Sequence, residues 1–443
     1  MSEQSEIAAP IEPLGAGVAL SRHQVRHQVL NDIAGTKMVP LSEAVEVNPK
    51  LDRSLLADDL DVSFVPMASV EALTGGIDVS TIRKYAEVKK GYTHFREGDV
   101  LFAKVTPCME NGKMAIARKL VNGVGFGSTE FHVLRPRANV DARYIYYFVS
   151  SQTFRKEAAG HMTGAVGLRR VPSAFLEDCE IPLPHIDEQR RIVAELEKQF
   201  SRLDEAVTNL KRVKANLKRY KASVLKDAVE GRLVKPDVFS EAAAATPLVR
   251  LCDAVLFNPK IDRSSLTNET LVSFVPMASV GAANGQIDVS QERNYLEVKK
   301  GYTYFREGDV LFAKVTPCME NGKMAVVKCL KNGVGFGSTE FHVLRPRAGV
   351  DAQYVYYFVS SEAFRKEAAR HMTGAVGLRR VPTAFLESVE IPLPHIDKQR
   401  RIVDEVERRF SLVRGAETEV EANLKRSQAL RQSTLSKAFA TNH

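Results

Sequence analysis

Two long stretches of the chain place apolar residues three or four positions apart, which is the spacing of one face of an α-helix. The first, within 187–230, contains no Gly or Pro and has its apolar stripe at Ile192, Leu196, Phe200, Leu203, Val207, Leu210, Val213, Leu217, Tyr220 and Val224. The second, within 397–440, repeats the pattern at Ile402, Val406, Phe410, Val413, Ala416, Val420, Leu424, Leu430 and Ala438. The sequence therefore predicts two long amphipathic helices.

Each helix would be a rod of roughly 60 Å at about 1.5 Å per residue, too long to pack wholly against one small domain. Two such stripes in one chain can bury each other as a coiled coil. The segment 231–247 between them carries Pro236 and the Ala run Ala242–Ala245, and is long enough to let the chain turn. An antiparallel pair would place one globular domain at each end, related by a pseudo-two-fold axis. A parallel pair with the domains side by side is the competing geometry.

The segment before the first long helix has a mixed pattern. Three runs, Val62–Met67, Asp99–Val105 and Thr129–Pro136, are rich in β-branched and aromatic residues and are bounded by turn residues, as strands are. The pair Asn111-Gly112 indicates a two-residue hairpin turn. Asp141 is the expected N-cap of a helix that continues to Ala159. These elements predict an α+β domain of about 150 residues.

The chain contains this domain twice. Sliding the sequence by 210 positions places Val62–Val193 on Val272–Val403 without a gap, and 24 of the 132 paired positions differ, which leaves 108 identities. A repeat of this length is a duplicated domain and not a solenoid array. The predicted fold class is α+β, with two homologous domains separated by two long antiparallel coiled-coil helices.

The duplication sets the expected domain boundaries. They are 1–37, a tail with a short helix-like piece at 21–33; 38–186, the first domain; 187–230, the first long helix; 231–247, a linker; 248–396, the second domain; and 397–440, the second long helix.

Composition is that of an ordinary globular protein, with 44% hydrophobic and 26% charged residues among 443. No run approaches the roughly 18 consecutive apolar residues that span a bilayer, and the N-terminus lacks the pattern of a secretory signal. We therefore expect a cytoplasmic protein. Its five Cys form no C-x-x-C pair, so neither a disulfide framework nor a zinc site is indicated. The net charge of +8 favours a polyanionic partner only weakly.

The best candidate for catalysis is Asp78 with Glu87 and Lys89, repeated as Asp288 with Glu297 and Lys299. Such a set can hold Mg²⁺ through carboxylates while Lys polarises water, as in many nucleases. No Pro precedes either Asp, and solvated charges explain the set better.

The other motifs give weaker evidence for catalysis. The run Gly123–Ser128 resembles a nucleotide-binding loop, but a predicted strand follows it where a helix would be needed, so we interpret its glycines as tight turns. His94 becomes Tyr304 in the second copy, which argues against a shared catalytic role. A base-methylating enzyme would need a cofactor fold and a Pro-Pro-aromatic motif, and neither is present. The sequence predicts that this chain catalyses nothing by itself.

Two polar loops recur unchanged in both copies: KVTPCMENGK at Lys104–Lys113 and HMTGAVGLRR at His161–Arg170. Lys and Arg suit phosphate and guanine, Asn suits adenine, and Thr or Ser suits either, although the loops could also be plain polar turns. The candidate DNA-binding residues are Lys104, Thr106, Glu110, Asn111, Lys113, Ser128, Thr163, Arg169 and Arg170, with Lys314, Thr316, Glu320, Asn321, Lys323, Ser338, Thr373, Arg379 and Arg380 in the second copy.

The junction between each domain and its helix carries a resemblance to a known family. IPLPHIDEQRRIV (Ile181–Val193) and IPLPHIDKQRRIV (Ile391–Val403) resemble the segment that joins each target-recognition domain to its spacer helix in the specificity subunit of type I restriction-modification enzymes. The resemblance extends from about Val39 to Ala438. His185 and His395 depart from it, since the family usually has a second Pro there.

The resemblance implies a non-catalytic DNA reader that docks two adenine-N6 methyltransferase subunits and, in the full enzyme, two restriction subunits. S-adenosylmethionine, Mg²⁺ and ATP would belong to those partners. The helices would set the number of unread base pairs between two half-sites. A free-standing DNA-binding protein and a Mg²⁺-dependent nuclease remain the alternatives.

The near-identity of the copies predicts a target that is an interrupted inverted repeat. The differences cluster at Glu71–Gly76, at Thr81–Ala86 and near Ile116–Lys119, which we interpret as outer loops and turns. Of the single exchanges, His94 to Tyr304 and Lys84 to Asn294 are expected to be the most able to alter a base preference.

Overall fold

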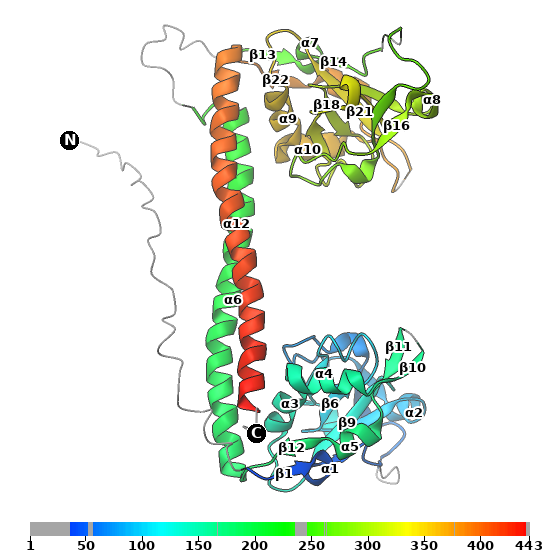
Figure 1. Cartoon of the computed structure of the whole chain (residues 1–443), viewed down its shortest axis with the longest axis vertical. Coiled ribbons are helices and arrows are strands. Elements are labelled where there is room, and N and C mark those ends of the chain that lie inside the picture. Colours follow the sequence, from blue (N-terminus) through cyan, green and yellow to red (C-terminus); the bar gives the residue numbers. More distant parts are fainter. Residues whose placement is uncertain are drawn as a thin grey trace, which may run out of the picture. The chain divides into compact units, whose positions relative to one another are not determined.

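The computed structural model of the chain describes residues 36–51, 56–165, 167–234, 246–260, 262, 264–375 and 377–439. The expected N-terminal helix-like piece at 21–33 and most of the linker lie outside these ranges. The chain forms two compact units (Figure 1), Met1–Thr208 with Leu424–His443 and Asn209–Asn423. No helix among the described residues is long and apolar enough to cross a membrane.

The first unit contains the first domain. Its elements are β1 (Met38–Pro40), α1 (Leu41–Ala44), β2 (Val45–Val47), β3 (Asp61–Val65), β4 (Ile82–Lys84), α2 (Tyr85–Val88), β5 (Thr93–Arg96), β6 (Val100–Ala103), β7 (Met114–Ile116), β8 (Val124–Gly127), β9 (Phe131–Pro136), α3 (Ala142–Ser150), α4 (Gln152–Gly160), β10 (Thr163–Ala165), β11 (Leu168–Arg170), α5 (Ser173–Asp178) and β12 (Glu180–Pro182), followed by the long helix α6 (Ile186–Val229).

The second unit repeats this order. Its elements are β13 (Leu248–Arg250), α7 (Leu251–Ala254), β14 (Val255–Phe257), β15 (Leu271–Val275), β16 (Glu292–Asn294), α8 (Tyr295–Val298), β17 (Thr303–Arg306), β18 (Val310–Ala313), β19 (Met324–Val326), β20 (Val334–Gly337), β21 (Phe341–Pro346), α9 (Ala352–Ser360), α10 (Glu362–Arg370), α11 (Thr383–Ser388) and β22 (Glu390–Pro392), followed by α12 (Ile396–Ala438).

Each domain is built on two four-stranded sheets. In the first domain the strand orders are β2-β9-β6-β7, which is antiparallel, and β4-β3-β8-β5, in which β3 and β8 are parallel. Alternate residues of β6 pack into different layers: Val100 and Phe102 into the core beneath α3, and Leu101 and Ala103 into the core between the sheets. Because both faces of β6 are buried, its sequence is continuously apolar, as expected for a covered strand.

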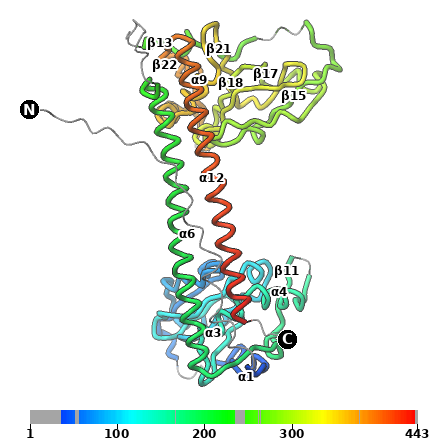
Figure 2. Tube along the Cα trace, turned by 60° about the vertical axis from the view of Figure 1, so that its left-hand side comes forward, coloured from blue at the N-terminus to red at the C-terminus, as the bar shows by residue number. Residues whose placement is uncertain are grey.

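In each unit a segment of α6 lies beside a segment of α12 (Figures 1 and 2). In the second unit Lys214 pairs with Glu421 at 3.0 Å and Lys221 with Glu417 at 2.7 Å, so the segments run antiparallel. In the first unit Arg431 of α12 pairs with Asp204 at 2.6 Å and lies over the ring of Phe200. The predicted antiparallel pairing of the helices is therefore confirmed.

Both domains bury the end of the other copy's helix. The first core includes Ile192 and Leu196 of α6 together with Leu435 and Ala438 of α12. The second core includes Val224 and Ala228 of α6 together with Ile402 and Val406 of α12. Each domain thus packs on the first turns of its own helix and on the last turns of the other helix.

Three local predictions were wrong in form. Between β6 and β7 the chain makes a ten-residue connection, and not a two-residue hairpin at Asn111-Gly112. Gly125 and Gly127 lie in strand β8 and not in tight turns; a Cβ would meet the ring of Phe95 at Gly125 and the Val65 carbonyl at Gly127. The helix capped by Asp141 ends at Ser150, because Ser151 is extended and caps a second helix, α4, by accepting the Phe154 amide.

Gln189, in the segment that carries the family resemblance, fixes α6 to the first domain. Its side chain is buried, accepts the Asp141 amide at 2.9 Å and donates to the carbonyls of Pro184 at 2.9 Å and Asn139 at 3.3 Å. Gln399 makes the equivalent bonds in the second domain.

We expect Gln189→Ala to lower the free energy of unfolding by about 2–4 kcal/mol, because several buried backbone groups lose their partner at once. Urea unfolding measures the loss, and hydrogen exchange at the Asp141 amide should speed up. Glu188→Ala is the control, since it removes only a surface pair with Arg191 and should cost less than about 1 kcal/mol. Equal losses in the two variants would contradict the assigned role of Gln189.

His132 and His342 are buried and neutral. In the first copy Nδ1 accepts from the Asn48 amide at 2.9 Å and Nε2 donates to the Val171 carbonyl at 2.8 Å. Burial lowers the pKa of both imidazoles below the ordinary value of 6.5.

Because the unfolded chain takes up these protons and the folded chain resists them, their contribution to stability is full above pH 6.5. It is lost as the pH falls from 6.5 through the folded pKa. NMR titration of the imidazole signals should therefore give midpoints below 6.5 for both residues, and a midpoint at or above 6.5 for either would contradict the assignment.

Candidate nucleic-acid interface

The segment 104–113, which we call the central loop, connects β6 to β7. It folds as a helical turn in which the Met109 amide donates to the Val105 carbonyl at 3.0 Å and the Asn111 amide to the Pro107 carbonyl at 2.9 Å. Met109 is fully buried and anchors the turn. Gly112 ends it with a φ of +70°, a conformation that favours glycine. This geometry leaves Glu110 and Asn111 exposed at the tip.

The second predicted loop forms a hairpin of β10 and β11, which we call the recognition hairpin (163–170). Thr106 of the central loop joins it: the Thr106 hydroxyl accepts from the Arg169 amide at 3.0 Å and donates to the Gly167 carbonyl at 3.2 Å. Arg169 also pairs with Glu110 across the two loops at 3.6 Å. The two loops that the sequence singled out are therefore one continuous surface.

Glu130, which sequence reasoning missed, forms hydrogen bonds with three of the predicted residues. The Arg170 guanidinium donates to its carboxylate from two nitrogens, at 2.6 Å and 2.9 Å, and holds the pKa of Glu130 below its usual range. The Glu130 amide donates to the Ser128 hydroxyl, and its carbonyl accepts from the Lys104 amide. Two of the five N–H donors of Arg170 are thus engaged within the fold.

The candidate residues differ in how much of their polar capacity the fold uses. The Lys113 ammonium donates to the Met67 carbonyl at 3.0 Å, so it fastens the loop from beneath. Asn111 and Thr163 are exposed, and their side chains form no hydrogen bond with any described residue. These two are the best placed to contact a ligand.

The second copy has the same arrangement. Arg380 pairs with Glu340 at 2.6 Å, Arg379 with Glu320 at 3.6 Å, and Lys323 donates to the Met277 carbonyl at 2.9 Å. Its equivalents of the remaining candidates, Lys314, Thr316, Asn321, Ser338 and Thr373, occupy the same positions along the loops. Two contacts differ in form. Thr373 and Arg380 pair by an isolated bridge in place of two strands, and the Thr316 hydroxyl donates to the Arg379 carbonyl, whereas the Thr106 hydroxyl accepts from the Arg169 amide.

Arg155 of α4 also escaped the sequence reasoning. Its guanidinium donates to the Glu110 carbonyl at 2.7 Å and to Gln432 of α12 at 3.1 Å. Arg365 donates to the Glu320 carbonyl at 2.6 Å in the second copy. Arg155 is therefore a positioning residue for the tip of the central loop, and nothing in its local sequence signals this.

A third element, the turn 71–76, lies against the end of the central loop, and we call it the flanking turn. The Leu73 amide donates to the Gly112 carbonyl at 3.0 Å, and Ala72 bridges to Lys113. The sequence predicts only an outer turn for this segment. The structure places it beside the predicted DNA-binding residues.

The nuclease set is not brought together. Hydrogen bonds from the Ser80 hydroxyl and the Ser80 amide lower the pKa of Asp78 within its own turn, while Lys89 pairs with Asp58 at 2.8 Å. No group of three or more His, Cys, Asp or Glu residues that could hold a metal ion occurs in the part of the chain that the structure describes.

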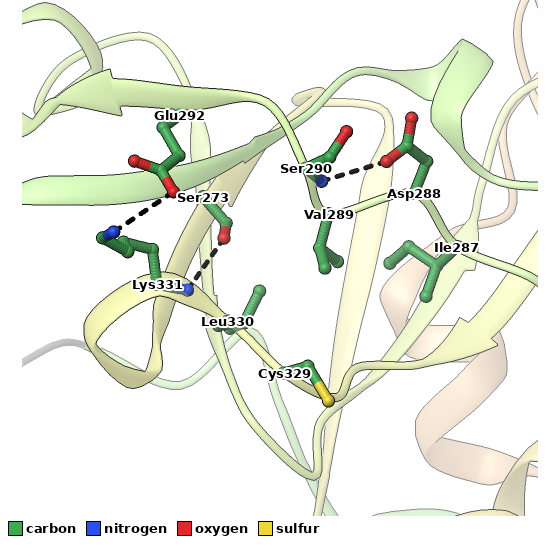
Figure 3. Close-up of a pocket in the computed structure, with 9 residues that line it drawn as sticks. All are labelled: Ser273, Ile287, Asp288, Val289, Ser290, Glu292, Cys329, Leu330 and Lys331. Atoms are coloured by element: carbon green, nitrogen blue, oxygen red, sulfur yellow. Dashed lines mark hydrogen bonds and ion pairs between the residues drawn. The ribbon is translucent and has the colours of Figure 1, made fainter.

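In the second copy Asp288 lines an open cavity of about 450 Å³ (Figure 3). Its polar groups bond one another: Asp288 accepts the Ser290 amide, Ser273 accepts the Lys331 amide, and Glu292 pairs with Lys331 at 3.3 Å. Glu297 and Lys299 are not among the lining residues. The cavity therefore does not bring Asp288 together with Glu297 and Lys299, the set that the sequence suggested.

Comparison with known proteins agrees with the fold and the repeat. A family model described as the type I restriction modification DNA specificity domain matches residues 35–219 and 251–422. The specificity subunit of the type I restriction enzyme EcoAI from Escherichia coli is 40% identical over 172 residues, which are 39% of this chain and 29% of that protein. The matched segment therefore spans less than a third of that relative.

Longer matches are more distant. The EcoKI specificity subunit from Escherichia coli strain K12 is 25% identical over 313 residues, 69% of this chain and 67% of that protein. A chain from a type I R-M system, solved to explain complex assembly and conformational transition, is 20% identical with a TM-score of 0.69, covering 91% of this chain and 97% of its own. The HsdS subunit from Thermoanaerobacter tengcongensis gives a TM-score of 0.54 at 20% identity, covering 91% and 96%. These two likenesses concern the fold.

Proposed function

Because the chain belongs to the family of type I restriction modification DNA specificity domains, we propose that it is the non-catalytic DNA-recognition subunit of a type I restriction-modification complex. It reads double-stranded DNA with two domains and docks two adenine-N6 methyltransferase subunits and two restriction subunits in the cytoplasm. S-adenosylmethionine, Mg²⁺ and ATP are bound by those partners.

The observation that carries the proposal is the doubled loop surface. In each copy the central loop and the recognition hairpin are joined through Thr106 or Thr316 and have identical sequences. They present Lys, Arg, Asn and Thr, whose side chains match phosphates and base edges.

The target we propose has two nearly identical half-sites in inverted orientation, separated by unread base pairs. Two features support it: the loops do not differ between copies, and each domain packs on its own helix and on the other helix in the same way. Two equivalent readers related by a two-fold axis select an inverted repeat.

The test is to express the chain with its methyltransferase partner in a host free of adenine methylation and to map N6-methyladenine by single-molecule sequencing. We expect one interrupted motif, with near-matching inverted halves, that is absent when either protein is expressed alone. A soluble complex that methylates no motif would contradict the proposal. Sequence-specific binding of DNA by the chain alone would then favour a free-standing DNA-binding protein.

A further inference from the structure

The flanking turn is the part of the loop surface in which the two copies differ most. Four of its six positions change, from Glu71, Leu73, Thr74 and Gly76 to Gly281, Ala283, Asn284 and Gln286. The central loop and the recognition hairpin do not change at any position. The surface therefore consists of two elements common to both copies and one that distinguishes them.

The backbone of the turn is the same in both copies. The residue 71 amide donates to the residue 76 carbonyl at 2.9 Å, as does 281 to 286, and both turns bind the carbonyl of the Gly in the central loop at 3.0 Å. Tyr146 packs beneath Gly75, and Tyr356 packs beneath Gly285 in the same manner. Different side chains are thus displayed from one fixed frame.

Both turns hold a non-glycine residue in the left-handed region, with a φ of +66° at Leu73 and +55° at Ala283. This conformation is unfavourable for residues with a Cβ, and local strain of this kind concentrates at functional sites. In the first copy the Leu73 side chain lies where a Cβ on Gly112 would be, so it covers that corner of the central loop. In the second copy a Cβ added at Gly322 would meet the Ala283 Cβ at 3.4 Å, so Ala283 covers less of the corresponding corner.

The two sets of side chains are each internally consistent. The Glu71 side chain lies over Gly76, and a Cβ added at Gly76 would be 2.6 Å from the Glu71 carboxylate. This carboxylate also accepts from the Thr74 hydroxyl at 2.7 Å. In the second copy the Asn284 side chain lies over Gly281, and a Cβ added at Gly281 would be 2.2 Å from the Asn284 side-chain oxygen. The Asn284 amide also donates to the Gln286 side chain at 2.9 Å. The exchanges are therefore coupled, because a side chain added at Gly76 would meet the Glu71 carboxylate and one added at Gly281 would meet the Asn284 amide.

The two sets of side chains differ in their hydrogen-bond donors and acceptors, which is also how the edges of the bases differ. A carboxylate such as Glu71 accepts from the cytosine amino group and repels phosphate, whereas Asn and Gln donate and accept together and suit adenine. Glu71, Thr74, Asn284 and Gln286 are all exposed.

We propose that the flanking turn is a base-reading element, and that it makes the two otherwise matching half-sites differ. This inference rests on the proposed DNA-recognition function. It assigns the asymmetry of the target to Glu71–Gly76 and Gly281–Gln286.

The two single exchanges singled out from the sequence, at positions 84 and 94, lie on strands β4 and β5 of one sheet. His94 packs against Phe126, and Tyr304 lies beneath the guanidinium of Arg345, which pairs with buried Asp309. Lys84 pairs with Asp61 at 2.8 Å on strand β4. The asymmetry of the target is therefore assigned to the flanking turn in place of these two exchanges.

The experiment transfers the whole turn. Residues 71–76 are replaced by Gly-Ala-Ala-Asn-Gly-Gln, the sequence of 281–286, and the chain is expressed with its methyltransferase for N6-methyladenine mapping. The wild-type motif should have halves that differ, and the graft should change the preference in one half by about tenfold or more, so that the halves match there. The reverse graft, Glu-Ala-Leu-Thr-Gly-Gly at 281–286, should also make the two halves match. Both halves should then carry the base that the first copy prefers.

The controls are Tyr304→His and Arg370→Gly, which also transfer residues between copies and should leave the motif unchanged; Arg370 pairs with Glu367 at the end of α10. Thermal unfolding checks that each graft folds, and if one graft does not, the reverse graft decides. Identical halves in the wild-type motif, or a graft that methylates the unchanged motif, would overturn the role of the turn and leave the proposed function standing. Absence of any wild-type motif from a soluble complex would overturn both.

Discussion

Replacing Asn111 by Ala should slow methylation of the native target about 5- to 150-fold, and Asn321→Ala should slow it by a similar factor. Asn111 lies at the exposed tip of the central loop, and its amide can make the paired donor and acceptor contact that reads adenine. Loss of such a contact is worth about 1–3 kcal/mol. Because the loops around the two Asn residues are identical, the two effects should be alike.

The double variant should lose roughly the product of the two factors, since distant sites contribute independently to a free energy. The measurement is kcat/KM for methyl transfer to a duplex that carries the mapped motif. Asn139→Gly is the control, because the second copy has Gly349 at that position and should tolerate the change. A wild-type rate of methylation with the double variant would contradict a role of the central-loop tip in contacting bases.

Arg155→Met should weaken DNA binding about 10- to 100-fold although Arg155 need not touch DNA. Its guanidinium donates to the Glu110 carbonyl and fixes the tip on which Asn111 lies. Removing it leaves that carbonyl without its charged donor, at a cost of about 1–3 kcal/mol, and frees the tip to move. The equivalent change, Arg365→Met, should act in the same direction.

Lys156→Met is the matched control, since it removes the same charge from an exposed position next along α4. The salt dependence of the dissociation constant separates positioning from phosphate contact. Loss of a phosphate contact lowers the slope of log K against log salt by about one, whereas loss of positioning leaves the slope unchanged. A lower slope in Arg155→Met would mean that this guanidinium contacts DNA itself.

The pattern of apolar residues predicted the long helices to within two residues at each end. The predicted first helix began at 187 and ended at 230, and α6 runs from Ile186 to Val229. Strong periodicity over many turns determines such a helix almost by itself. Short-range signals were less reliable, because the burial of Met109 and the packing of Phe95 on Gly125 are tertiary facts that override turn chemistry.

The candidate site was predicted in part. Repetition drew attention to the central loop and the recognition hairpin. The flanking turn stood out in the sequence only as a place where the copies differ, and its position beside the central loop was not predicted. Glu130 and Arg155 lay outside the loops and were found only through their contacts with Arg170 and Glu110. Contacts of this kind depend on how strands and helices that are distant along the chain meet, and the pattern of one sequence does not reveal this.

The sharing of helix ends also determines the order in which the protein can mature on the ribosome. The second unit is one continuous stretch, Asn209–Asn423, whereas the first needs Leu435 and Ala438 to close its core. At a synthesis rate of roughly 5–20 residues per second, the first domain waits on the order of ten to fifty seconds for them. During that time Tyr144 and Phe148 lack the ring of Phe439, which packs on both in the finished domain. The domain that is made first is therefore the one that is finished last.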